Sequence, residues 1–122
     1  FDIINKQGSY DGGLIAPGID LSLNILHQAA AQLPLIEIKK PKYVIGKNTV
    51  EAMTSGTFWG YVGLVEGLIS KIKDELNDKE VTVISTGGLS SLFFSSCNLI
   101  EKSDKDLTLK GLFLVNKRNK CG

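Results

Sequence analysis

The stretch that decides the fold is Gly46-Lys47-Asn48-Thr49, because it begins the longest helix that the sequence predicts. Asn48 is a favourable N-cap residue, and Glu51 three residues later can complete a capping box. Thr49 then lies in the first turn, where backbone N–H groups lack partners within the helix and the helix dipole favours an anion. Gly46 lets the chain approach this turn closely, so a small carboxylate or phosphate could reach these donors. An ordinary capped helix without a ligand is the alternative interpretation.

The helix that follows is predicted over residues 49–76, and it contains four regularly spaced glycines. Their spacings of four, three and four residues place them along one stripe of the helix. Each glycine costs about 1 kcal/mol relative to alanine in a helix interior. We therefore expect another backbone to approach this stripe closely, the alternative being scattered glycines that the helix merely tolerates. The four are Gly56, Gly60, Gly63 and Gly67.

The rest of the chain predicts an α/β fold with a mixed β-sheet and helices on both faces. A hairpin precedes an apolar helix over residues 19–33, which we expect to pack on two sides, against the sheet and against a second subunit. Residues 81–85 are rich in β-branched side chains and predict a buried central strand. The other expected elements are a hairpin of residues 1–5 and 9–15, a strand at 35–38, a helix from residue 89, an edge segment at 98–101 and a helix over 110–119.

Composition excludes several classes of protein. A chain of 122 residues fits one domain, and its formal net charge of +1 argues against a nucleic-acid partner, which requires a concentrated basic face. No apolar run approaches the length that crosses a membrane. Cys97 and Cys121 lack metal-ligand spacing and are interpreted as free thiols, so we expect a cytoplasmic protein. The chain begins inside an expected strand at Phe1, which suggests the C-terminal part of a longer polypeptide.

Three glycine-marked turns lead into helices, where ligands of α/β proteins bind. One is Thr86-Gly87-Gly88, which follows the expected buried strand and lets a flat or anionic ligand approach its backbone. The other two are residues 46–49 and the stretch containing Gly12, Gly13, Pro17 and Gly18. Together they predict a binding cleft. No catalytic constellation, Walker-type loop or metal-ligand set accompanies them.

Taken together, these motifs resemble one family, the type III pantothenate kinases. The resemblance covers nearly the whole chain but only the C-terminal half of the family pattern. The matching stretches are Gly12–Gly18, Ala31–Pro34, Gly46–Thr49, Ser55-Gly56, Gly60-Tyr61, Gly63, Val65–Gly67, Thr86–Gly88 and Leu107–Leu112.

The resemblance implies a fold and a set of site residues. The fold is the ribonuclease-H-like lobe of the actin-like ATPase superfamily, with residues 1–122 forming the C-terminal lobe of a homodimeric enzyme. Thr49 would contact pantothenate, with His27 or Gln28 of a partner subunit completing the pocket. Gly12, Gly13, Pro17 and Gly18 would lie on the substrate side of the cleft, and Thr86, Gly87 and Gly88 on the adenosine side. The missing half would carry the ATP-phosphate loop, the proton-accepting aspartate and the ligands of Mg²⁺ and of K⁺ or NH₄⁺.

The implied reaction is the phosphorylation of pantothenate by ATP to 4′-phosphopantothenate and ADP, the first step of coenzyme A synthesis. The chain alone would lack the phosphate loop and the catalytic aspartate. A non-catalytic regulatory or dimerisation module on the same scaffold is the main alternative. A sugar or acetate kinase of the same superfamily is a further alternative, although such enzymes carry different substrate-lobe motifs.

Overall fold

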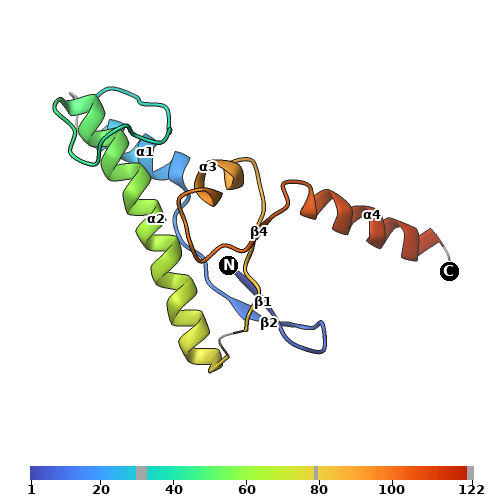
Figure 1. The fold of residues 1–122 in the computed structure, drawn as a ribbon. Coiled ribbons are helices and arrows are strands. Elements are labelled where there is room, and N and C mark those ends of the chain that lie inside the picture. Colours follow the sequence, from blue (N-terminus) through green and yellow to red (C-terminus); the bar gives the residue numbers. More distant parts are fainter. Residues whose placement is uncertain (30–32, 79, 121–122) are drawn as a thin grey trace. The chain divides into compact units, whose positions relative to one another are not determined.

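The computed structural model describes residues 1–29, 33–78 and 80–120, in which two strands and two helices are followed by alternating short strands and helices. The chain divides into two units, Phe1–Ile36 and Glu37–Gly122. The first unit holds strands β1 (Asp2–Ile4) and β2 (Tyr10–Gly13) and helix α1 (Ile19–Ala29) (Figure 1). The second holds α2 (Thr49–Leu76), β3 (Ile84–Ser85), α3 (Ser90–Phe94), β4 (Lys102–Ser103) and α4 (Leu107–Lys120).

The expected hairpin in the first unit is confirmed. Strands β1 and β2 pair in antiparallel fashion. Asn5 shapes the turn between them, since its side-chain oxygen accepts hydrogen bonds from the N–H groups of Gln7 at 3.1 Å and Ser9 at 2.9 Å. Gly8 closes the turn with a φ of +78°. The pairing register shifts between Ile3 and Ile4, which indicates a β-bulge in β2.

Helix α1 begins at Ile19 as predicted. The Gly18 carbonyl accepts a hydrogen bond from Ser22 N–H at 3.0 Å, and this bond starts the helix. Ile19 and Leu23 are buried, whereas Leu21, Ile25 and Leu26 are exposed. The last residues of the expected helix, 30–32, lie outside the described residues, as does part of the motif at 31–34.

Helix α2 has the predicted bounds, because both of its ends are capped by side chain or backbone. Asn48 caps the start in an extended conformation. Asn77 caps the end in the left-handed conformation, with φ of 48°, and its N–H donates to the Asp74 carbonyl at 3.2 Å. The helix is therefore closed at both termini by asparagine.

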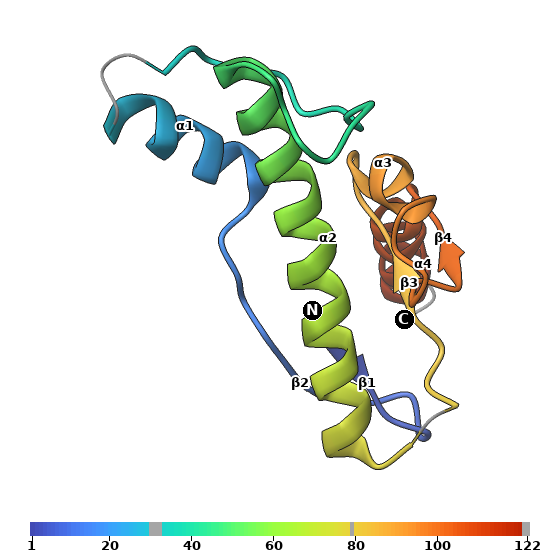
Figure 2. The same ribbon diagram turned by 60° about the vertical axis from the view of Figure 1, so that its left-hand side comes forward.

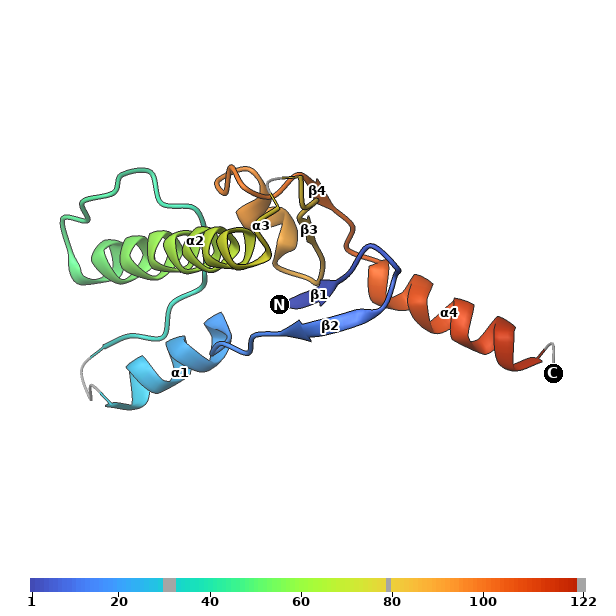
Figure 3. The same cartoon turned by 90° about the horizontal axis from the view of Figure 1, so that it is seen from below.

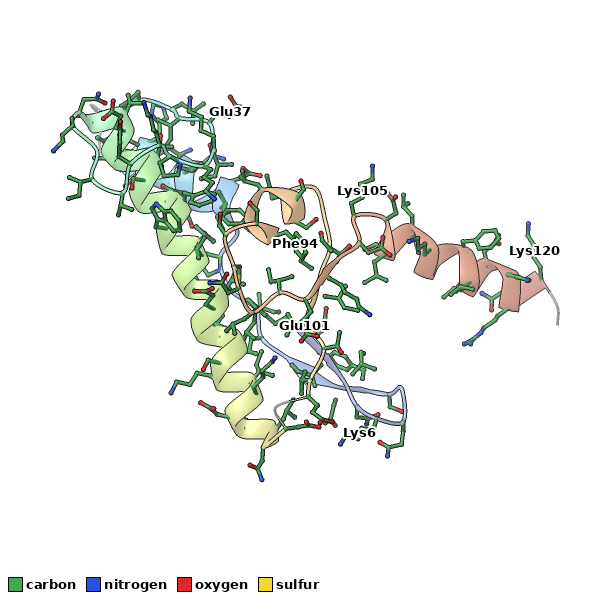
Figure 4. All side chains as sticks on the ribbon, viewed as in Figure 1. Lys6, Glu37, Phe94, Glu101, Lys105 and Lys120 are labelled. Atoms are coloured by element: carbon green, nitrogen blue, oxygen red, sulfur yellow. The ribbon has the colours of Figure 1, made fainter. Side chains whose placement is uncertain are left out.

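One face of α2 forms the core of the second unit. Phe58 is fully buried and stacks on Phe93 of α3, with ring centroids 5.2 Å apart, so α3 lies beside α2 in both Figure 1 and Figure 2. The following loop is tied to the same helix farther along. Asn98 N–H donates to Glu66 Oε1 at 2.9 Å, and Lys73 forms an ion pair with Glu101 at 3.7 Å. Glu101, labelled in Figure 4, lies on the loop that leads from α3 to β4.

The four glycines of α2 lie on the opposite side of the helix from this core. At about 100° per residue, they point some 140–200° away from Phe58. A Cβ atom at Gly56, Gly60, Gly63 or Gly67 would meet nothing within 4 Å. The periodicity predicted one stripe correctly, but the described part of the chain places no backbone against it.

The strands correct the expected sheet. The α/β class is confirmed, yet the described strands form two small sheets, β1–β2 antiparallel and β3–β4 parallel, and not one mixed sheet. The predicted buried strand at 81–85 is confined to Ile84–Ser85, and Ile84 is 48% exposed, because the one strand that pairs with it in the described part of the chain is the two-residue β4. Residues 35–38 form no strand, and the edge segment forms at Lys102–Ser103 instead of 98–101.

The last helix, α4, begins three residues before the predicted start. Asp104 precedes it, and its carboxylate accepts a hydrogen bond from Lys110 Nζ at 2.7 Å. Helix α4 extends away from α3 and β4 in Figure 3, and none of its residues is buried. Among the described helices, none combines the length and apolar character needed to cross a membrane.

Candidate functional site

The N-terminus of α2 is built as a capping arrangement that differs slightly from the predicted one. Asn48 Oδ1 accepts a hydrogen bond from Glu51 N–H at 2.9 Å, as expected. The Glu51 carboxylate, however, accepts from Lys47 N–H at 2.8 Å and not from Asn48. The capping box therefore closes one residue earlier, and it draws the loop before Asn48 onto the helix.

Thr49 is the first residue of α2 and is exposed. The N–H groups of Thr49 and Val50 belong to the first turn, in which an α-helix provides no internal acceptor. Glu51 places a negative charge in the same turn, but it lies about 200° around the helix from Thr49. An anion would therefore be held on the Thr49 side, where the side-chain hydroxyl adds a further donor.

Gly46 lies directly against the backbone of α2. A Cβ at this position would overlap the Ala52 nitrogen and would lie 2.7 Å from Ala52 Cα. Since real Cβ atoms do not approach backbone so closely, only glycine fits here without a shift of the loop. The close approach that the sequence predicted for Gly46 is confirmed.

A link that sequence reasoning missed holds the same loop. The Ser55 hydroxyl donates to the Val44 carbonyl, and Ser55 is buried. A signal for it was present, because Ser55 precedes Phe58 by three residues and so occupies the core face of the helix. A polar side chain at a core position needs a hydrogen-bond partner, and here the partner is the loop.

The turn Thr86-Gly87-Gly88 has a different construction. Gly87 has a φ of +96°, which glycine adopts readily, and its carbonyl accepts from Ser90 Oγ at 2.7 Å and Ser90 N–H at 3.2 Å. A Cβ at Gly88 would meet nothing within 4 Å, so its backbone is open to approach. The turn leads into α3, a helix of only five residues. Its open backbone suits a flat ligand better than an anion.

The structure explains the glycines of the first unit by local geometry. Gly12 lies at the bulge with a φ of +119°, and a Cβ at Gly13 would overlap the Phe1 carbonyl. Pro17 and Gly18 lead into α1. These four residues belong to the first unit, whereas Thr49 and residues 86–88 belong to the second. No hydrogen bond or ion pair among the described residues joins the two turns of the second unit.

Histidine, cysteine and acidic side chains do not gather into a metal site. In residues 1–29, 33–78 and 80–120, no three of them lie close enough to hold a metal ion. His27 Nδ1 lies 2.6 Å from the Leu33 carbonyl. The magnesium and monovalent cations that the resemblance implies have no ligand set among these residues, so no chemical step is assigned to a metal held here.

Cys97 is a buried thiol beside Glu66. Burial raises the pKa of Cys97, and the negative charge of Glu66 raises it further. The group is therefore protonated near neutral pH, and a thiol is a much weaker nucleophile than a thiolate. We assign Cys97 to the packing between α2 and the loop after α3.

A family model and individual proteins that are similar to this chain carry the same description. A family model described as type III pantothenate kinase matches residues 1–71. Proteins with the same description are 52% identical in Rhodospirillum centenum, over 98% of this chain and 47% of that protein, and 50% identical in Phenylobacterium zucineum, over 99% and 47%. One from Acidiphilium cryptum is 55% identical, over 98% and 44%. The chain thus spans about half the length of the curated relatives it matches.

Proposed function

Because the chain belongs to the type III pantothenate kinase family, we propose that it is the C-terminal part of an enzyme that phosphorylates pantothenate. The reaction transfers the γ-phosphoryl group of ATP to the primary hydroxyl of pantothenate and yields 4′-phosphopantothenate and ADP. Family membership is the observation that carries this proposal. The matched residues include both the glycine stretch at 12–18 and the start of α2.

In this proposal Thr49 binds the substrate. Pantothenate carries a carboxylate at one end and the reacting hydroxyl at the other. The open N–H groups of the first turn of α2 and the Thr49 hydroxyl suit the carboxylate, since hydrogen bonds from such donors to a charged acceptor are stronger than neutral ones. Gly12, Gly13, Pro17 and Gly18 line the substrate side in the complete enzyme.

The nucleotide is bound on the other side of the cleft. The exposed backbone of Thr86, Gly87 and Gly88 supports a role as the adenosine wall, because a base can lie against glycines without meeting a Cβ atom. The chain contains neither the Asp-x-Gly-Asn-Thr loop nor the Gly-x-Asp-Arg segment of the family. Phosphate positioning and proton acceptance, with Mg²⁺ and K⁺ or NH₄⁺, are therefore assigned to the other half of the enzyme.

The proposal extends to assembly and location. The complete protein would have the ribonuclease-H-like lobes of the actin-like ATPase superfamily and would act in the cytoplasm, with residues 1–122 as its C-terminal lobe. A homodimer is supported by two surfaces, the exposed apolar side chains of α1 and the open glycine stripe of α2. Equilibrium sedimentation of the complete protein tests this, and a monomer at all concentrations would contradict it.

Replacing Thr49 by valine in the complete enzyme tests the substrate site. The change removes the hydroxyl and keeps the side-chain shape. We expect the KM for pantothenate to rise about tenfold, the loss typical of a hydrogen bond to a charged group, with the KM for ATP nearly unchanged. Steady-state kinetics measured by ADP release gives both constants.

The matched control is Thr108→Val, which removes an exposed hydroxyl from the first turn of a different helix, α4. Its KM for pantothenate should equal that of the wild type. An unaltered KM in Thr49→Val would remove Thr49 from the site. A complete protein that turns over neither pantothenate nor a panel of sugars and acetate would favour the non-catalytic module.

A further inference from the structure

Ser55 makes an unusual bond for a serine inside a helix. Such hydroxyls commonly bond back to the carbonyl four residues earlier, and its neighbour Thr54 does so, donating to Val50 at 2.8 Å. The Ser55 hydroxyl instead leaves the helix and donates to the Val44 carbonyl, eleven residues earlier. Ser55 is only 3% exposed, so the donor side of this bond is buried, whereas Val44 on the acceptor side is exposed.

The loop that Ser55 holds has few other means of staying in place. Tyr43, Val44 and Ile45 are apolar or aromatic, yet they are 64%, 67% and 72% exposed. Burial of their side chains therefore contributes little to the position of the loop. The position of the loop therefore depends on its contacts with α2.

These contacts lie on both sides of Gly46. Before it, Val44 accepts the bond from Ser55, and after it, Lys47 N–H donates to the Glu51 carboxylate at 2.8 Å. Between them, Gly46 rests against the backbone of Ala52. The loop is thus clamped onto the first two turns of α2, immediately before Asn48 and Thr49.

Ser55 acts at a distance from any ligand at Thr49. The two residues are six positions apart, or about 9 Å along the helix axis. We propose that Ser55 is a positioning residue for substrate binding: its bond to Val44 keeps the 44–48 loop on α2, so that the Thr49 end of the helix stays open to the substrate carboxylate. This inference rests on the proposed function of Thr49.

Ser55→Ala in the complete enzyme removes the bond with little change in volume. We expect the KM for pantothenate to rise about fivefold, the usual effect of losing one neutral hydrogen bond, while kcat and the KM for ATP change less than about twofold. Hydrogen exchange at the amides of residues 44–47 should become faster without substrate. Ser55→Cys, which retains a weak donor, should restore part of the affinity.

Thr54→Val is the matched control, because it removes a buried hydroxyl from the adjacent residue without touching the loop. It should alter neither the KM for pantothenate nor exchange at 44–47. An unaltered KM in Ser55→Ala would overturn the inference, and so would an equal rise in Thr54→Val. If Ser55→Ala does not fold, Gly46→Ala displaces the same loop and must raise the KM; an unaltered KM there also overturns the inference.

The outcomes separate this inference from the function on which it rests. A raised KM in Thr49→Val with an unaltered KM in Ser55→Ala refutes the positioning role alone. An unaltered KM in Thr49→Val refutes the substrate site itself. In that case hydrogen exchange still decides whether Ser55 holds the loop: unchanged exchange in Ser55→Ala refutes the clamp as well.

Discussion

Two glycine-marked turns lead into helices in the second unit, and each needs glycine for a different reason. Gly46 precedes α2 and needs to be small, because the backbone of Ala52 occupies the space of a Cβ. Gly87 precedes α3 and needs conformational freedom, because its φ is +96° although a Cβ there would meet nothing within 4 Å. In the sequence the two turns look alike. In the structure, one is shaped by a neighbouring helix and the other by its own backbone.

The difference extends to what holds each turn. The first is fixed to a helix of 28 residues by Ser55 and Glu51. The second is held by hydrogen bonds from the Ser90 hydroxyl and N–H to the Gly87 carbonyl, at the start of a helix of five residues. A turn clamped in this way can present backbone donors in a constant geometry, which suits the recognition of an anion. A turn with an open glycine surface suits a flat group that needs area more than fixed donors.

Gly46→Ala should have the largest effect on stability. The added Cβ overlaps the backbone of Ala52, so the loop must move, and forcing extra atoms into such a space costs about 1–3 kcal/mol of unfolding free energy. Chemical denaturation measures the loss.

The same substitution at Gly111 is the control and should act in the opposite direction. Its Cβ would lie in open space on α4, and alanine stabilises a helix interior by about 1 kcal/mol relative to glycine. Equal losses at both positions would mean that Gly46 is not confined by α2, and the comparison between the two turns would fail.

Gly87→Ala should have the next largest effect and lower the free energy of unfolding by about 1–2 kcal/mol, because an L-residue with a Cβ is strained at positive φ. Gly88→Ala next to it, where neither space nor φ demands glycine, should change stability by less than about 0.5 kcal/mol. Thermal or chemical unfolding of both variants distinguishes them. If Gly88→Ala destabilised as much as Gly87→Ala, crowding and not backbone conformation would govern this turn.

A surface ion pair holds a third junction, the start of α4. Removing this ion pair should have the smallest effect on stability. The hydrogen bond from Lys110 lowers the pKa of Asp104 below its ordinary 3.8, and the same bond raises the pKa of Lys110 above 10.5. The stabilisation is therefore complete between about pH 4 and 10.5. It is lost as pH falls through the lowered pKa of Asp104 or rises through the raised pKa of Lys110.

Asp104→Asn tests this junction by circular dichroism of helix content against pH. The variant should lose both pH-dependent slopes, whereas Asp106→Asn should keep them. Persistence of the acid slope in Asp104→Asn would assign it to another carboxylate. Because Lys110 is exposed and Asp104 is partly exposed, solvent screens the pair, and the effect should be smaller than that of either glycine substitution.

Local signals in the sequence predicted local structure well. The bounds of α2 follow from two asparagines. The side chain of Asn48 caps the start of the helix, and Asn77 ends it in the left-handed conformation. The turn at residues 6–8 follows from Gly8. The close approach at Gly46 could also be predicted, since a glycine two residues before an N-cap has little other purpose there.

Features that depend on distant partners could not be predicted. The run at 81–85 has the composition of a buried strand, but burial requires strands on both sides, and among the described residues Lys102–Ser103 alone pairs with Ile84–Ser85. The bond from Ser55 to Val44 depends on how the loop folds back onto α2. The core position of Ser55 indicates that its hydroxyl needs a partner, but nothing in the local sequence identifies Val44 as that partner, so the contact itself emerged only from the structure.

The burial of Cys97 beside Glu66 makes its alkylation rate a measure of local opening in the second unit. Alkylating reagents consume the thiolate, and here burial and the charge of Glu66, which raise the pKa of Cys97, suppress that form while the loop after α3 remains packed on α2. We expect a reagent to reach the buried sulfur when the loop after α3 separates from α2. The alkylation rate of Cys97, measured by peptide mass, therefore reports how often this local opening occurs, without any dye or engineered probe.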